Sequence, residues 1–139
     1  ELLYKAVHHN HPCTLWTRQT TGNYDWHYQL FAELCNEFTK RFGKTHLSES
    51  LLLERLKKHP VKLPKGARTK FPLAMSNLPE CMVEDPVQSY RNYYIAKQSY
   101  MPCDWNKGTP MPSWFKKLDV EGVDMFLQEK RYEQQYHQV

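Results

Sequence analysis

The fold is organised around residues 85–115, which begin with DPVQSYRNYYIAK at 85–97 and close with PSWF at 112–115. Asp85 is a favourable N-cap, and Pro86 suits the first position of a helix because proline lacks the N–H that would go unpaired there. Pro102 cannot continue a helix. The stretch therefore predicts a helix from Pro86 to about Tyr100, followed by a proline-containing loop that tryptophan and phenylalanine side chains pin to the core.

Upstream of this stretch, apolar residues recur at helical spacing. From Tyr24 they fall at i, i+3, i+4 and i+7, so one face of a helix is apolar as far as Phe42. Asn23 is the predicted N-cap. Gly43 is the predicted C-terminal residue, because glycine adopts the left-handed backbone conformation that ends helices. This periodicity predicts the longest helix of the chain.

Two further segments have helical spacing. The first begins at Ser48 and ends at the dipeptide His59-Pro60, and the second covers residues 119–138. Residues 61–73 contain prolines and a glycine, so they predict an extended connector. No convincing strand pattern is present. The sequence therefore predicts an all-α fold, a single compact domain of about four helices over residues 1–139 with long proline-containing loops.

Length and composition restrict the class of protein. A chain of 139 residues can bury a core without disulfides or a structural metal. Its four cysteines are widely spread, which predicts reduced thiols in a cytoplasmic protein. No apolar run approaches the roughly 20 residues that span a bilayer, so we expect no membrane partner. The chain starts with Glu1 and not with Met, so we expect either a fragment, which would lack an N-terminal segment, or a processed product.

Positive charge is concentrated between residues 40 and 70. This region holds ten lysines and arginines against two glutamates, whereas the whole chain has a net charge of only +4. The segment after Asp119 is acidic, so the charge is polarised along the chain. A concentrated positive field attracts polyanions such as nucleic acid. The alternative interpretation is a solvated face with a flexible loop.

The central helix combines aromatic and basic side chains. Tyr90, Tyr94 and Lys97 share one face, and Arg91 lies on a neighbouring face. Aromatic rings beside cations suit stacking on bases and pairing with phosphates. The same tyrosines equally suit a core, in which each hydroxyl finds one hydrogen-bond partner.

Two residues are candidates for acid–base chemistry. His46 follows the end of the longest helix and could orient an anion or transfer a proton. A structural histidine that bridges the turn is the alternative interpretation. Glu33 is a candidate general base, because a DNA glycosylase needs little more than one carboxylate near a pocket for an extruded base. Most helical glutamates are solvated or paired, as the spacing of Glu37 and Arg41 would allow.

Several other chemistries are disfavoured. The cluster of His8, His9, His11 and Cys13 fits no standard metal spacing, so we expect no metal site there, with His11 bonded into the fold instead. The chain has no glycine-rich phosphate loop, no Gly-x-Ser-x-Gly elbow and no His-Glu-x-x-His. We expect no cofactor.

Several short motifs together resemble an uncharacterised small-protein family of tailed bacteriophages, over roughly residues 4–115. The motifs are His11-Pro12 with Trp16, Tyr24-x-Trp26, Arg41-Phe42-Gly43-Lys44-x-His46, Ala74-Met75, Tyr90-Arg91-x-Tyr93-Tyr94 and Pro112-x-Trp114-Phe115. Members of the family carry an additional N-terminal segment that is similar to the start of the phage pyrimidine-dimer DNA glycosylases. The resemblance implies a phage origin and a DNA-directed role. It also implies Lys44, His46, Tyr90, Arg91 and Tyr94 as site residues.

The sequence therefore leads to three hypotheses from different classes. The first is a phage-encoded DNA-binding protein of the host cytoplasm, with DNA repair of the glycosylase-like or base-modifying type as its extension and His46 and Glu33 as catalytic candidates. The main alternative is a non-enzymatic interaction module for a host or phage protein, and the third is a purely structural component of the virion. The predicted nucleic-acid contacts are Arg41, Lys44, Lys65, Arg68, Lys70, Tyr90, Arg91, Tyr94 and Lys97.

Overall fold

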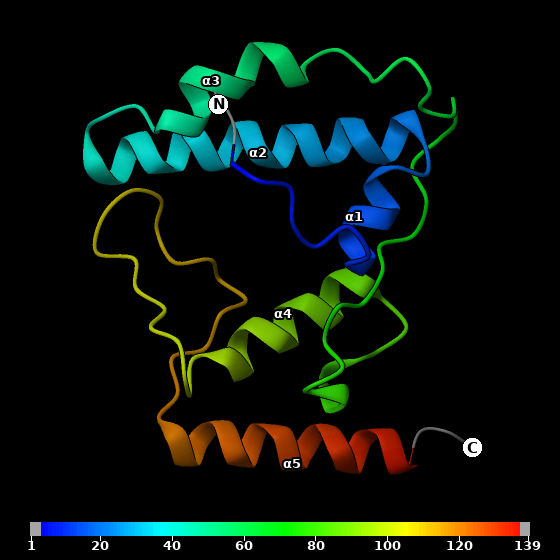
Figure 1. Cartoon of the computed structure of the whole chain (residues 1–139). Helices are drawn as coiled ribbons and strands as arrows, with labels where there is room; N and C mark the ends of the chain where they lie inside the picture. The colour runs from blue at the N-terminus through cyan, green and yellow to red at the C-terminus, as the bar shows by residue number, and fades with distance from the viewer. Residues whose placement is uncertain (1–3, 137–139) are drawn as a thin grey trace. The chain divides into compact units, whose positions relative to one another are not determined.

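A computed structural model describes residues 4–136 and shows helices joined by long loops, with no strand in this range (Figure 1). The all-α prediction is confirmed. No helix within these residues is long and apolar enough to cross a membrane. The elements are α1 (Pro12–Thr17), α2 (Thr21–Phe42), α3 (Leu47–Leu56), the short 3-10 helix η1 (Pro79–Cys81), α4 (Pro86–Lys97) and α5 (Val120–Tyr136).

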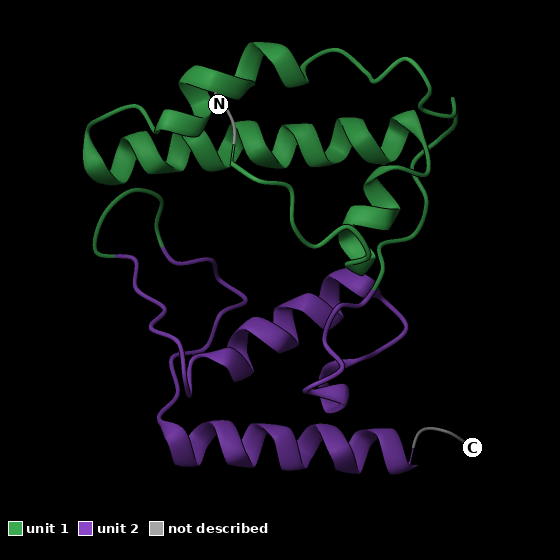
Figure 2. Ribbon diagram, viewed as in Figure 1, with its two compact units in different colours: residues 1–72, 106–110 green, residues 73–105, 111–139 purple. Residues whose placement is uncertain are grey.

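The chain divides into two compact units, shown in green and purple in Figure 2. Unit 1 contains the described residues up to Pro72 together with Asn106–Pro110. Unit 2 contains Leu73–Trp105 and the described residues from Met111 onward. The prediction that the whole chain is one domain stays a prediction, and each unit is described by itself.

In unit 1 the longest helix begins earlier than predicted. The N-cap of α2 is Thr20, not Asn23, because the Thr20 hydroxyl accepts a hydrogen bond from the Asn23 N–H at 3.0 Å. The predicted glycine end is confirmed, since Gly43 has φ +66° and its N–H donates to the carbonyl of Thr39. Asn23 is fully buried inside the first turn of the helix, where its side chain makes other contacts.

Helix α3 packs alongside α2 through tyrosine hydroxyls. Tyr24 donates to the carbonyl of Leu56 at 2.6 Å, and Tyr28 donates to the carbonyl of Leu53 at 2.8 Å. These carbonyls lie in the last turn of α3, where the helix itself supplies no N–H partners. The two tyrosines therefore hold the C-terminal end of α3 against α2.

Unit 2 has the larger apolar core. Asp85 caps α4 as predicted, accepting from the Val87 N–H at 3.0 Å. Helix α4 ends at Lys97, before the predicted Tyr100, because the N–H of Tyr100 bonds to the Lys97 carbonyl in a tighter turn. The core lies among η1, α4, α5 and the loops between them. It consists of Met75, Cys81, Ile95, Ala96, Phe115, Val123, Phe126 and Leu127.

The loops of unit 2 are tied to its helices. The Gln98 side chain donates to the Lys116 carbonyl at 2.8 Å and accepts from the Leu118 N–H at 2.9 Å. Trp105 lies against Phe115, with ring centroids 4.7 Å apart. Helix α5 begins after Asp119, and its predicted end at Gln138 lies outside the described residues. All four cysteines are free thiols, and burial raises the pKa of Cys81 to about 11.

Candidate nucleic-acid interface

The segment that follows α3 is the most basic part of unit 1, and we call residues 57–70 the basic strap. Its six charged side chains are all positive, and all six residues are exposed. They are Lys57, Lys58, Lys62, Lys65, Arg68 and Lys70. Fourteen residues of this composition, without secondary structure of their own, would ordinarily form a mobile loop.

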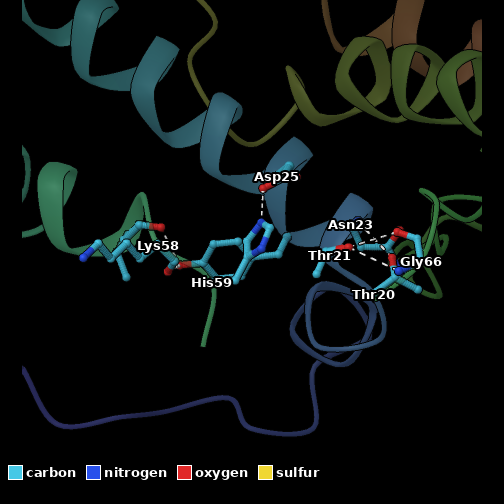
Figure 3. A network of polar contacts seen from close by, with 9 residues as sticks. Thr20, Thr21, Asn23, Asp25, Lys58, His59 and Gly66 are labelled. Carbon is cyan, nitrogen blue, oxygen red and sulfur yellow. Dashed lines mark hydrogen bonds and ion pairs between the residues drawn. The ribbon is translucent and has the colours of Figure 1, made fainter. Parts of the chain in front are cut away.

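The strap is instead clasped to the start of α2 by its backbone (Figure 3). The N–H of Thr21 donates to the Pro64 carbonyl at 2.9 Å, and the N–H of Gly22 donates to the Gly66 carbonyl at 2.9 Å. The first N–H groups of a helix have no partner within it, so the strap carbonyls satisfy groups that would otherwise face water. Gly22 must remain a glycine for this approach, because a Cβ there would overlap the backbone nitrogen of Arg68.

We call the contacts between residues 20–23 and residues 64–69 the clasp. Threonine side chains at the start of α2 contribute to it as well as the backbone. Thr20 donates from its hydroxyl to the Ala67 carbonyl at 3.0 Å, and the Thr21 hydroxyl lies 3.2 Å from both the N and O of Gly66. Short polar residues at a helix start are commonly local caps. Here they also fix a segment that follows more than forty positions later in the chain.

Buried Asn23 is the centre of the clasp. Its amide NH₂ donates to the Trp16 carbonyl at 2.8 Å and to the Thr69 hydroxyl at 3.0 Å. Its amide oxygen accepts from the Thr69 N–H at 2.8 Å. Next to it, Phe71 packs between Trp16 and Trp26, with ring centroids at 5.2 Å and 4.6 Å. The downstream end of the strap is therefore anchored by both hydrogen bonds and aromatic packing.

The upstream end is anchored by a histidine. Nε2 of His59 lies 2.5 Å from Oδ1 of Asp25 on α2, as the dashed line in Figure 3 marks. The His59 ring also meets Tyr24 edge-on, with centroids 5.6 Å apart. The strap is thus held near both ends, and its charged side chains project from an ordered backbone.

The charges of the strap are largely uncompensated. None of its five lysines makes an ion pair or a ring contact with the residues that the structure describes. Arg68 lies over the Phe71 ring, 4.9 Å from its centroid. Like charges on one short ordered segment raise the local potential. Such a segment can neutralise phosphates without first having to be ordered.

Two predicted contacts lie elsewhere in unit 1. Arg41 is engaged, because its Nε is 2.9 Å from Oε1 of Glu37. Thr109 also donates to Glu37, from its hydroxyl at 2.5 Å and from its N–H at 3.0 Å. The bonds from Thr109, reinforced by Arg41, lower the pKa of Glu37 to about 2. Lys44 is exposed just after the end of α2.

The remaining predicted contacts lie in unit 2, on α4. The Tyr90 hydroxyl accepts from the Ala74 N–H at 3.2 Å, and its ring packs against the core. Arg91 lies 5.6 Å from the centroid of the Trp114 ring. Lys97 lies over Tyr93 and Tyr94, at 4.9 Å and 5.4 Å, and Tyr94 is 46% exposed. These side chains therefore serve packing within unit 2, and they belong to a different unit from the strap.

The catalytic candidates have no shared geometry in the described chain. His46 is the N-cap of α3, accepting from the Ser48 N–H at 3.0 Å, and its ring meets Phe38 edge-on. Glu33 is exposed and makes no hydrogen bond or ion pair with residues 4–136. No described contact joins His46 to Glu33. These contacts support the structural role for His46, in which it bridges the turn between α2 and α3.

The N-terminal histidines behave as ordinary loop residues. His11 caps α1, since its Nδ1 accepts from the Cys13 N–H at 3.1 Å. Within residues 4–136 no three His, Cys, Asp or Glu side chains come together in a way that could hold a metal ion.

Sequence reasoning did not find the clasp. Lys57, Lys58 and Lys62 belong to the charged run, but Thr20, Thr21 and Asn23 resemble ordinary caps and give no signal of a distant partner. A pocket of about 530 Å³ in unit 2 was also missed. It is lined by Glu80, Met82, Val83, Glu84, Lys130, Glu133 and Gln134.

Comparisons with known proteins add no further constraint: no protein-family model, curated protein or solved structure matches this chain.

Proposed function

We propose that this chain binds DNA through the basic strap of unit 1. The observation that carries the proposal is the clasp, which holds fourteen residues with six positive and no negative side chains in an ordered, exposed conformation. Phosphate groups are the ligands that such a row of cations fits, and the released counterions drive the association.

The chemistry of the strap also indicates what kind of DNA binding to expect. Residues 57–70 contain no tyrosine, tryptophan or phenylalanine, and Phe71 is engaged by Trp16, Trp26 and Arg68. Stacking on exposed bases is therefore not supplied by the strap. Lysine contacts to phosphates position a protein without reading sequence. We propose sequence-independent binding to the DNA backbone, and no described contact supports adding base chemistry to it.

Salt dependence tests the proposal directly. Binding of a fluorescent DNA duplex of about 20 base pairs would be measured by anisotropy over a series of salt concentrations. If all six strap cations contact phosphates, log K falls with log salt with a slope of about −5. The double variant Lys62→Ala/Lys65→Ala should flatten this slope by about 2.

A matched control separates the strap from net charge. Lys107→Ala/Lys116→Ala removes the same charge from two exposed lysines outside the strap, and its slope should equal that of the unmodified protein. Equal losses in both double variants would reduce the effect to net charge and overturn the proposal. Absent or salt-insensitive binding to both single-stranded and double-stranded DNA would overturn it as well.

A further inference from the structure

Helix α5 of unit 2 has a second apolar face that the core does not use. Its buried residues Val123, Phe126 and Leu127 face η1 and α4. On the opposite side, Met125 is 70% exposed, Tyr132 is 62% exposed and Tyr136 is 58% exposed. We call these three residues the outer stripe. An i, i+7, i+11 spacing places them on one side of the helix.

The stripe is already organised for contact. The rings of Tyr132 and Tyr136 pack on each other with centroids 4.3 Å apart, which limits the freedom of both side chains. Met125 is unbranched and polarisable, so it adapts to the shape of an apolar partner. Tyrosine and methionine are also enriched at protein interfaces relative to the rest of the surface.

Negative charge next to the stripe favours a positively charged partner. Glu121 and Glu129 lie four residues on either side of Met125, and Glu129 is also three residues before Tyr132. Both glutamates are exposed and have no ion-pair partner among the described residues. The basic residues of α5 are engaged elsewhere, Lys130 with Glu133 and Arg131 with Glu80.

The pocket of about 530 Å³ beside α5 adds no uncompensated charge at Glu80 and Glu133, because these residues pair with Arg131 and Lys130. A partner that covers the stripe therefore meets uncompensated carboxylates at Glu121 and Glu129.

We propose that the outer stripe of α5 binds a basic amphipathic helix of another protein. Apolar side chains of the partner would cover Met125, Tyr132 and Tyr136, and its lysines or arginines would face Glu121 and Glu129. Recognition would be by packing of one helix on another, with specificity from charge complementarity. A second copy of this chain fits less well, because antiparallel pairing of two α5 helices would bring glutamates toward glutamates. An anionic membrane surface is disfavoured for the same reason.

The probe for the test is a designed peptide of about five helical turns, with leucines at i, i+3, i+4 and i+7 and lysines elsewhere. A second peptide replaces every lysine with glutamate. The 139-residue chain should bind the lysine peptide, and Met125→Ser/Tyr132→Ser should weaken binding about tenfold. Val120→Ser is the control, because Val120 is a 62% exposed apolar residue of the same helix outside the stripe.

The outcomes separate this proposal from DNA binding. DNA affinity of the stripe variant should be unchanged, and any binding of the glutamate peptide, which the basic strap could attract, should survive in that variant. Equal loss of lysine-peptide binding in Val120→Ser and the stripe variant would overturn the proposal. A dimer in sedimentation that dissociates in the stripe variant would also overturn it, in favour of a second copy as the occupant.

Discussion

The basic strap and helix α4 both carry positive charge, but they differ in how many of their cations lie over aromatic rings. In α4, Arg91 and Lys97 each lie over rings of their own unit. In the strap only Arg68 does so, and the five lysines make no ion pair or ring contact within the described chain. A cation over a ring is partly satisfied and adds packing. An ordered, unpaired lysine adds mainly electrostatic potential.

The difference lies in how each segment acquires its order. Helix α4 is ordered by its own backbone hydrogen bonds and by a buried face, so its long side chains are drawn onto neighbouring rings. The strap has almost no buried side chain, with only Leu63 partly covered. Its backbone carbonyls and N–H groups supply the anchoring together with the side chains of His59 and Thr69, which leaves the lysine side chains free for solvent or a ligand.

The largest expected effect comes from breaking the clasp. Asn23→Ala removes the partners of the Thr69 N–H and the Trp16 carbonyl in a buried place, which should cost about 2–4 kcal/mol of unfolding free energy in urea denaturation. Asn36→Ala, at an exposed position of the same helix, should change it by less than about 0.5 kcal/mol.

The same variant tests whether order of the strap matters for binding. At a temperature where Asn23→Ala is still folded, its DNA affinity should fall although no positive charge has been removed. Hydrogen exchange at the Thr69 amide should become faster at the same time. Unchanged DNA affinity would mean that the lysines bind DNA without the clasp. The ordering of the strap would then not explain why its cations, and not those of α4, bind DNA.

A smaller effect is expected where α4 contacts its core. Tyr90→Phe leaves the Ala74 N–H without its acceptor and should cost about 1 kcal/mol in thermal or urea unfolding. Tyr94→Phe is the matched change, because Tyr94 is 46% exposed and its hydroxyl has no hydrogen bond in the described chain. Neither variant should alter DNA affinity. A loss of binding in Tyr94→Phe would show that the Tyr94 hydroxyl contacts DNA and would bring α4 back into the interface.

Replacing the cations of α4 should leave DNA binding unchanged. Arg91→Gln/Lys97→Gln removes three cation–ring contacts, one of Arg91 and two of Lys97, each worth about 0.5–1 kcal/mol of stability. The slope of DNA affinity against salt should stay within error of the unmodified protein. A flattening by about 2, as expected for Lys62→Ala/Lys65→Ala, would show that α4 contacts phosphates too.

Helical spacing was enough to predict helices close to α2, α3, α4 and α5, because apolar periodicity and caps such as Asp85 and Gly43 are local signals. The short helices α1 and η1 carry no such periodicity and were not predicted. Helical spacing also failed at the start of α2, where Asn23 has the right chemistry for a cap but is used in a contact with Thr69. A long-range hydrogen bond of this kind has no local signature. Residue type and spacing could not distinguish an Asn23 that caps the helix from an Asn23 that bonds to a distant segment.

The candidate site could be predicted only in part for a similar reason. The charged run between residues 40 and 70 is visible in the sequence, and so is the i, i+4 spacing that pairs Arg41 with Glu37. Other partners have no local signal, because Thr109 also binds Glu37 and Arg91 meets Trp114. Tertiary structure brings these residues together, so the predicted list mixed engaged and unpaired cations.

The engaged state of Arg41 can be tested through the titration of Glu37, whose pKa of about 2 lies below its ordinary value near 4.5. A carboxylate with a lowered folded-state pKa stabilises the fold above its unfolded pKa, and this contribution is lost as pH falls from about 4.5 toward 2. Thr109→Val removes the hydroxyl bond, which is the largest single cause, and Arg41→Gln removes the ion pair, so each variant should raise the pKa of Glu37. NMR titration of the Glu37 side-chain carboxyl measures both shifts. No shift in Arg41→Gln would mean that Arg41 is available to phosphates in the way the strap lysines are.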